Sequence, residues 1–232
     1  MMNLNSCICT IDEFISNESQ LMSVIVVQNG VDQRHCGIIY KFKGENSVIH
    51  LAWHYNLQHE LDMSNFQDYY SVKSQLDEYR QYALCAMCDV IKEDTNIPYA
   101  FYYQDTVFNE KGKLCLGKNE VGLTCATFVL AVFKSSSIEI LDLLTWPSRE
   151  DDTVFHRNIL NHLNKEMERG LVSQKHFDSV KSENSCARFR PEEVAIGSGF
   201  SFERMPLCYD DLKELSIEIK NKLESNFTKR RL

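Results

Sequence analysis

The chain has 232 residues, 44% of them hydrophobic and 25% charged, with a formal net charge of −8. This is the composition of an ordinary globular protein, and its acidic balance argues against nucleic acid or an anionic membrane surface as the main partner. No Lys or Arg precedes Arg34, and no apolar run approaches the ~20 residues of a transmembrane helix. We therefore expect a cytoplasmic protein without an integral membrane segment, although delivery as a secreted effector is also compatible with the sequence.

Nine cysteines are scattered along the chain, and their number is odd. This usage indicates free thiols in a reducing compartment rather than a disulfide scaffold. Cys85 and Cys88 lie in a helical pattern, where a buried thiol is common, and no second pair completes a zinc site. We expect neither a metal nor a cofactor.

Three apolar segments predict the start of an antiparallel sheet. Residues Leu21–Gln28 form an apolar run that ends at the turn signal Asn29-Gly30. Segments Cys36–Phe42 and Ser47–Trp53 are strand-like and are separated by a turn at residues 44–46. The last two segments are expected to pair as a hairpin.

Two histidines lie in this predicted hairpin. His35 stands at the start of the first strand and His50 inside the second, so pairing would bring them to one region of the sheet. His54 and His59 follow closely, in a segment that we interpret as solvated or packing.

Residues Ser64–Thr95 are predicted to form one helix that ends before Pro98. Apolar side chains recur there at steps of three and four, at Tyr69, Val72, Leu76, Tyr79, Ala83, Ala86 and Val90. Residues 99–122 are glycine-containing and loop-like.

A second helix is predicted to begin at Cys125. Residues Cys125, Phe128, Val129, Val132 and Phe133 share one helical face, which places the thiol in the first turn on the buried side. The positive end of the helix dipole favours a thiolate there.

The last hundred residues are mixed. Helices are predicted over Asp151–Arg169, Ser173–Glu183 and Asp210–Ser225, and a strand or long loop over Val194–Arg204. The histidines of this part, His156, His162 and His176, are expected to face solvent.

Three short stretches, His35–Ile39, Val48–Leu51 and Thr124–Val129, carry a family resemblance. In the order His, His, Cys they resemble the permuted NlpC-type papain-like cysteine enzymes, and within these the lecithin:retinol acyltransferase-like group. A fourth similarity is Pro98-Tyr99 before the cysteine. The resemblance covers residues 33–133 only.

The resemblance implies an α+β papain-like fold in permuted order. A small antiparallel sheet would pack on the Cys125 helix in a core of residues 21–140, and residues 141–232 would add a mainly helical extension to the same domain. Cys125 would be the nucleophile, His35 its base, and His50 would orient His35. Tyr99 and Thr124 would line the substrate or oxyanion site.

Ala126 and Thr127 stand where the acyltransferase group usually has acidic and His residues, which favours an amide over a lipid substrate. Our leading hypothesis is a hydrolase that cleaves a peptide-like amide bond through an acyl-enzyme. One alternative is an acyltransferase, thioesterase or phospholipase acting on fatty acyl groups. Another is an inactive binding module, since a lone thiol such as Cys125 or a strand histidine such as His50 is also common in an ordinary core.

Overall fold

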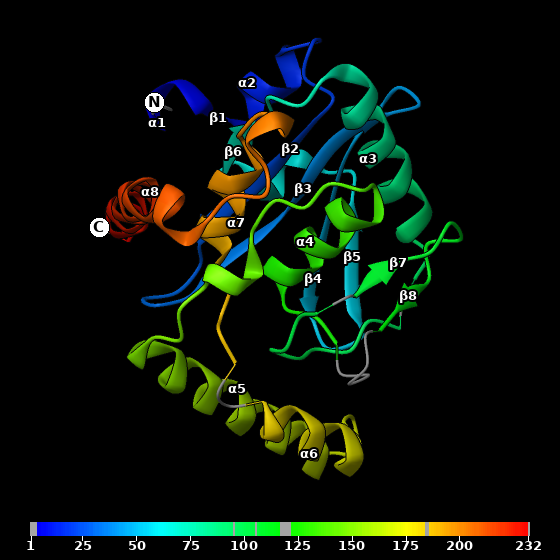
Figure 1. Cartoon of the computed structure of the whole chain (residues 1–232), viewed down its shortest axis with the longest axis vertical. Coiled ribbons are helices and arrows are strands. Elements are labelled where there is room, and N and C mark those ends of the chain that lie inside the picture. The colour runs from blue at the N-terminus through cyan, green and yellow to red at the C-terminus, as the bar shows by residue number, and fades with distance from the viewer. Residues whose placement is uncertain (1–3, 95, 105, 117–121, 184–185, 232) are drawn as a thin grey trace.

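The computed structural model describes residues 4–94, 96–104, 106–116, 122–183 and 186–231, and shows a mixed α+β fold around one antiparallel sheet. The six strands follow the order β1-β6-β2-β3-β4-β5 across the sheet (Figure 1). Their bounds are β1 Ile8–Thr10, β2 Met22–Gln28, β3 Arg34–Phe42, β4 Glu45–Trp53, β5 Asn56–Glu60 and β6 Tyr70–Lys73. A separate small hairpin joins β7 Val107–Phe108 to β8 Leu114–Cys115.

The helices are α1 Leu4–Cys7, α2 Ile11–Ser16, α3 Glu78–Ile91, α4 Cys125–Ser135, α5 Glu150–Glu168, α6 Gln174–Ser182, α7 Pro191–Ser198 and α8 Tyr209–Lys229. Three of them, α3, α4 and α7, pack on one face of the sheet (Figure 1). The core between sheet and helices contains Cys36, Ile38 and Tyr40 of β3. Because strand side chains alternate, the neighbouring Ile39 faces the other side, where it packs with Phe14 and Phe66.

The predicted hairpin is confirmed. Strands β3 and β4 are antiparallel, with a register that runs from Phe42 opposite Glu45 to Ile38 opposite Ile49. The apolar run before them forms β2, which pairs with β3 along its full length. The order of these three strands therefore follows the chain, with short connections.

The single helix predicted over Ser64–Thr95 is wrong. This segment contains a short 3-10 helix, Met63–Phe66, then strand β6, and only then α3. Strand β6 pairs with both β1 and β2, so partners distant in sequence outweigh the helical spacing of Tyr69 and Val72. The predicted apolar face of the helix is also displaced, since Tyr79 is 88% exposed and Cys85 and Cys88 are fully buried instead.

The helix predicted at Cys125 is confirmed as α4, although it is not amphipathic. Every residue from Ala126 to Phe133 is buried, because the sheet, α3 and α7 surround the helix. The strand or loop predicted over Val194–Arg204 is wrong: residues 191–198 form α7, with Pro191 in its first turn. Its residues Val194 to Ile196 belong to the main core, so the last hundred residues help to build it.

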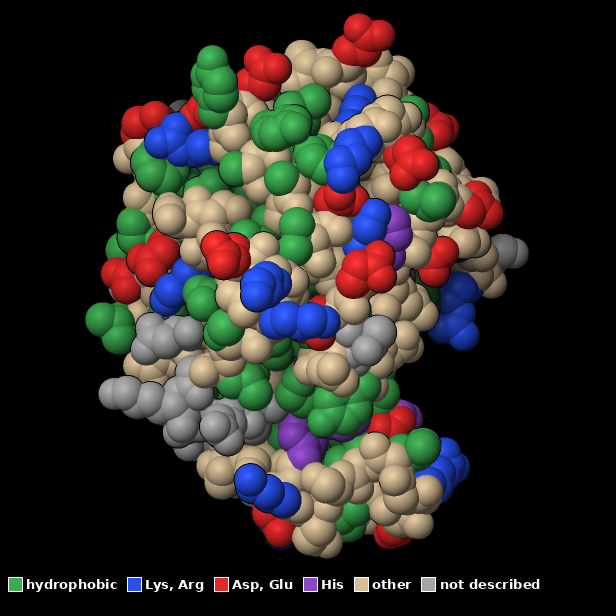
Figure 2. Space-filling model, turned by 90° about the vertical axis from the view of Figure 1, so that its right-hand side faces the viewer, with side chains coloured by type: hydrophobic (Ala, Val, Ile, Leu, Met, Phe, Trp, Pro, Cys, Tyr) green, Lys and Arg blue, Asp and Glu red, His purple; other side chains and the backbone are tan. Residues whose placement is uncertain are grey.

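The three other helices predicted after residue 150 are confirmed with small shifts of their ends, as α5, α6 and α8. Helices α5 and α6 form a hairpin at the lower end of the molecule (Figure 1). Hydrophobic and histidine side chains gather in the notch between this hairpin and the rest of the surface (Figure 2). Only His162 is exposed as expected; His156 is 2% exposed, and His176 is half-buried.

Within the described ranges, no helix is both long and apolar enough to cross a membrane.

Candidate active site

The sheet brings His35 and His50 together beside a glycine. Gly37 lies two residues after His35 on β3, and a Cβ added to Gly37 would stand 2.7 Å from His50 Cβ and 2.9 Å from the Ile49 carbonyl oxygen. Real side chains do not tolerate such distances. Gly37 is therefore the residue that lets the backbone carrying His50 approach β3 closely enough for the two rings to meet.

The two imidazoles are joined by a hydrogen bond. His35 Nε2 and His50 Nδ1 are 2.9 Å apart, and the rings are nearly perpendicular. Burial and the charge of His35 lower the pKa of His50 to about 4, so His50 is neutral at physiological pH. The bond uses Nε2 of His35 and Nδ1 of His50, so it leaves Nδ1 of His35 for another partner.

Cys125 occupies the first turn of α4. Thr124 caps the helix: its hydroxyl accepts from the Thr127 backbone N–H, and the Thr127 side chain accepts from the Thr124 N–H at 2.7 Å. The expected substrate-side residue Thr124 thus lines the site with its hydroxyl engaged in the cap. This cap fixes the point at which Cys125 and its backbone N–H emerge from the helix.

The pKa of the Cys125 thiol lies well below its ordinary value. The largest cause is a hydrogen bond with the Cys36 thiol, and the positive charge and hydrogen bond of His35 add to it against the penalty of burial. The thiolate form of Cys125 is therefore favoured beside His35. His35 consequently stands between the thiol and His50.

Cys36 belongs to this site, although no role was predicted for it from the sequence. It is fully buried on the α4 face of β3, and burial raises the pKa of its thiol well above the ordinary value. Cys36 therefore stays protonated and donates its S–H to the Cys125 thiolate. Its position directly after His35 was the available signal, because alternation along β3 turns the next side chain toward α4.

Tyr99 reaches the site through a contact between two loops. The Leu123 N–H donates to the Pro98 carbonyl at 2.9 Å, and the Ala100 N–H donates to the Leu123 carbonyl at 3.2 Å. Gly122 permits this contact, since it has a φ of +147° and an added Cβ would lie 2.2 Å from Pro98 O. Burial and the negative charge of Cys125 raise the pKa of Tyr99, which keeps its phenol protonated beside the thiol.

His35, Tyr99, Thr124 and Cys125 line a small cavity of about 70 Å³. The sheet and α4 supply one side of it, through His35, Trp53 and Thr124–Thr127. The other side comes from Phe155, His156 and Ile159 of α5 and from Arg188, Phe189 and Pro191. No role was predicted for the last hundred residues, yet they supply about a third of the residues that line the cavity around Cys125.

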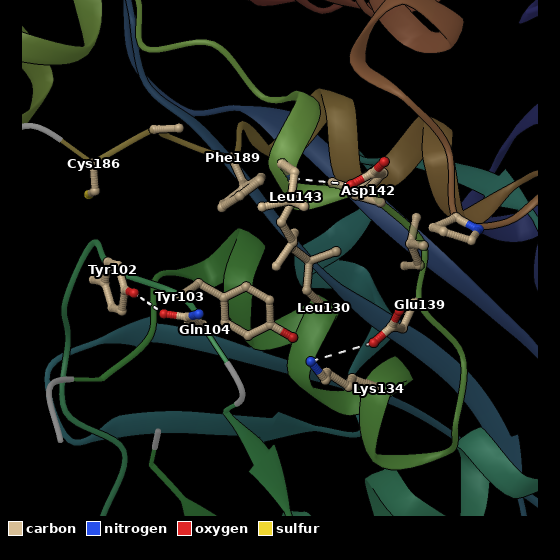
Figure 3. Close-up of a pocket in the computed structure, with 15 residues that line it drawn as sticks. Tyr102, Tyr103, Gln104, Leu130, Lys134, Glu139, Asp142, Leu143, Cys186 and Phe189 are labelled. Carbon is tan, nitrogen blue, oxygen red and sulfur yellow. Dashed lines mark hydrogen bonds and ion pairs between the residues drawn. The ribbon is translucent and has the colours of Figure 1, made fainter. Parts of the chain in front are cut away.

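A larger pocket of about 500 Å³ lies on the other side of Phe189, which lines both cavities. Figure 3 shows Tyr103, Leu130, Leu143 and Phe189 around it, with the ion pair between Lys134 and Glu139 at one end. Its lining is mainly apolar. A long apolar group could lie there next to the thiol cavity.

Candidate metal ligands do not cluster in the described part of the chain: no group of three or more His, Cys, Asp or Glu side chains is placed to hold an ion. Cys85 and Cys88 pack in the core as expected. Cys7 and Cys9 are buried as well.

The chain matches no protein-family model, no curated protein and no solved structure. The resemblance to the permuted NlpC-type enzymes thus rests on the stretches around His35, His50 and Cys125.

Proposed function

We propose that this protein is a cysteine hydrolase of the permuted NlpC-type papain-like group, with Cys125, His35 and His50 as its catalytic residues and a peptide-like amide as its substrate. One observation carries the proposal: His35 links a thiol with a lowered pKa to a neutral, buried His50. This is the order of nucleophile, base and orienting group.

The chemistry follows from the positions of these groups. The Cys125 thiolate attacks the carbonyl carbon, a C–S bond forms, and the oxyanion lies near the backbone N–H of Cys125 at the start of α4. The protonated His35 gives its proton to the leaving nitrogen, the C–N bond breaks, and an acyl-enzyme remains. His35 then takes a proton from water, which attacks the thioester and releases the acid and the Cys125 thiolate.

A second candidate is hydrolysis or transfer of a fatty acyl group. The apolar pocket beside Phe189 favours it, because its volume of about 500 Å³ suits part of an acyl chain. Release of fatty acid from thioesters or phospholipids, without cleavage of peptides, would select this candidate.

The deciding experiment compares Cys125→Ala with Cys208→Ala. Cys208 is exposed and has no place in the site, so its loss is the matched control. We expect iodoacetamide to label Cys125 rapidly even at pH 6, and Cys125→Ala to abolish both this labelling and the cleavage of a peptide library. Labelling of Cys125 no faster than that of Cys208 would contradict a thiol nucleophile and favour an inactive binding module.

A further inference from the structure

Arg188 lies at the wall of the thiol cavity. It lines the cavity with Cys125 and His35, in the connection between α6 and α7. Its guanidinium carbon stands 3.4 Å from the ring centre of Phe155, a second lining residue. The positive charge of Arg188 also acts on the phenol of Tyr99, a third lining residue. The guanidinium is thus located among groups that face the cavity.

The other arginines of this region are engaged with carboxylates. Arg34 Nε is 2.9 Å from Glu192 Oε2, and Arg190 is bonded to Asp151 at 2.6 Å. Arg149 pairs with Glu193. These ion pairs hold the start of α5 against α7 and the start of α7 against β3.

Arg188 differs from them. Within the part of the chain that the structure describes, no carboxylate oxygen lies within 4 Å of its guanidinium, and its N–H groups donate to no acceptor. A guanidinium has five N–H donors in a planar fork that fits a carboxylate. Stacking on Phe155 covers one face of the plane and leaves the donor edge for such a partner.

The environment of Arg188 is unfavourable for an isolated cation. Burial lowers the pKa of its side chain, although an arginine remains charged. Glu192 and Asp152 act on this half-buried cation, but among the described residues neither pairs with it within 4 Å, so an anion that binds beside it offsets part of the cost of its burial. The small cavity volume of about 70 Å³ suits a carboxylate better than a phosphodiester with its substituents.

We propose that Arg188 binds a carboxylate of the substrate next to the carbonyl that Cys125 attacks, so that the enzyme prefers acidic peptide-like substrates. This inference rests on the proposed thiol nucleophile. The carboxylate is either a free carboxyl terminus or an acidic side chain close to the cleaved bond, because both present the same group to the guanidinium.

The test uses two alkylating reagents of similar size: iodoacetate, which carries a carboxylate, and iodoacetamide, which carries a neutral carboxamide. Their rates at Cys125 are measured by mass spectrometry of the peptide that contains it. We expect Arg188→Gln to lower the ratio of the iodoacetate rate to the iodoacetamide rate about tenfold, and to leave the iodoacetamide rate within about twofold. Arg188→Lys, which keeps the charge without the fork, is expected to give an intermediate ratio.

Two controls separate this effect from a general change of charge. Arg204→Gln removes an arginine that also lies over an aromatic ring, that of Phe200, but outside the cavity. It should leave the ratio at Cys125 unchanged. The exposed Cys208 is an internal reference, and its ratio should be the same in all variants.

Protection experiments distinguish the two sources of the carboxylate. Three peptides are compared for their ability to protect Cys125 against iodoacetamide. The first is N-acetylated dialanine with a free carboxyl terminus, and the second is an amidated peptide with one internal glutamate. The third, fully neutral amidated dialanine, is the control. Protection by either acidic peptide supports the proposal and identifies the source. Protection by neither, or an unchanged reagent ratio in Arg188→Gln, would overturn it while Cys125 labelling in the wild type still supports the nucleophile.

Discussion

The chain contains two close histidine pairs, His35–His50 and His54–His176, with ring centres 4.8 and 4.6 Å apart. In the first pair the rings hydrogen-bond to each other beside a thiol. In the second pair each ring bonds to the backbone of Tyr99: His54 accepts from its N–H at 3.1 Å, and His176 donates to its carbonyl at 2.9 Å. The first histidine pair thus belongs to a candidate reactive site, whereas the second attaches α6 to the segment around Tyr99.

Helix α6 is also attached to the Tyr99 segment by a carboxyl group. Glu183 Oε2 accepts the backbone N–H groups of Phe101 and Tyr102, each at 3.1 Å. Trp53 donates to Glu166 of α5 at 2.7 Å. The hairpin of α5 and α6 is therefore held to the end of β4 and to the loop after Pro98, and so helps to form the thiol cavity.

The largest expected difference between the two pairs is in reactivity. His35→Gln should lower the alkylation rate of Cys125 by iodoacetamide at pH 6 about 100-fold, because the thiolate loses its cationic neighbour. His54→Gln should leave this rate within about twofold. Equal rates in the two variants, measured by mass spectrometry, would mean that His35 and Cys125 are not coupled.

The next effect tests how the first pair is built. Gly37→Ala should destabilise the fold by about 3 kcal/mol and slow Cys125 alkylation, since the new methyl group collides with His50. Gly44→Ala is the control: it has a φ of +84° and open space around the added Cβ, so only backbone strain of about 1 kcal/mol is expected. Urea denaturation measures both, and similar losses would contradict the close approach at Gly37.

A smaller effect concerns the attachment of α6 through Glu183. Burial raises the pKa of Glu183 to about 7 from an ordinary 4.5, so its stabilising contribution is present at low pH and is lost as the pH rises through about 7. At low pH the α6 amides of Glu183→Gln should therefore be as protected against hydrogen exchange as those of the wild type. At pH 8 their free energy of opening should be about 2 kcal/mol higher in the variant. Hydrogen exchange of the α6 amides at both pH values measures the difference, and a constant difference would exclude this titration.

The smallest effect has the opposite sign. The pKa of His54 is lowered to about 4 from 6.5, mainly by burial, so the unfolded state binds more protons and stability is lost as the pH falls from 6.5 to 4. Because His54 is only half-buried, we expect about 1 kcal/mol. As the pH falls from 6.5 to 4, the α6 amides of the wild type should lose protection against hydrogen exchange relative to those of His54→Gln. If protection depends on pH in the same way in both proteins, this prediction is wrong.

The parts of the candidate site that depend on interactions between neighbouring residues could be predicted from the sequence. Turn residues and alternation predict the two strands that carry His35 and His50, and a cap and an apolar pattern predict the helix that begins at Cys125. Each of these signals lies within about ten residues of the element that it predicts. By contrast, β6 and α7 were not identified. Strand β6 depends on pairing with β1 and β2, and α7 contains Gly197 and ends before Gly199, two residues that favour a loop unless buried neighbours hold the helix.

The sequence by itself determined which thiol begins a helix and which histidines share a hairpin, because these features depend on contacts between near neighbours. Only the tertiary structure decided that Cys36 hydrogen-bonds to the Cys125 thiol, that α5 lines the cavity, and that Arg188 lies there with no carboxylate of the described residues paired to it. These placements join segments as much as 150 residues apart. They result from packing of whole helices on the sheet, which no local pattern of residues encodes.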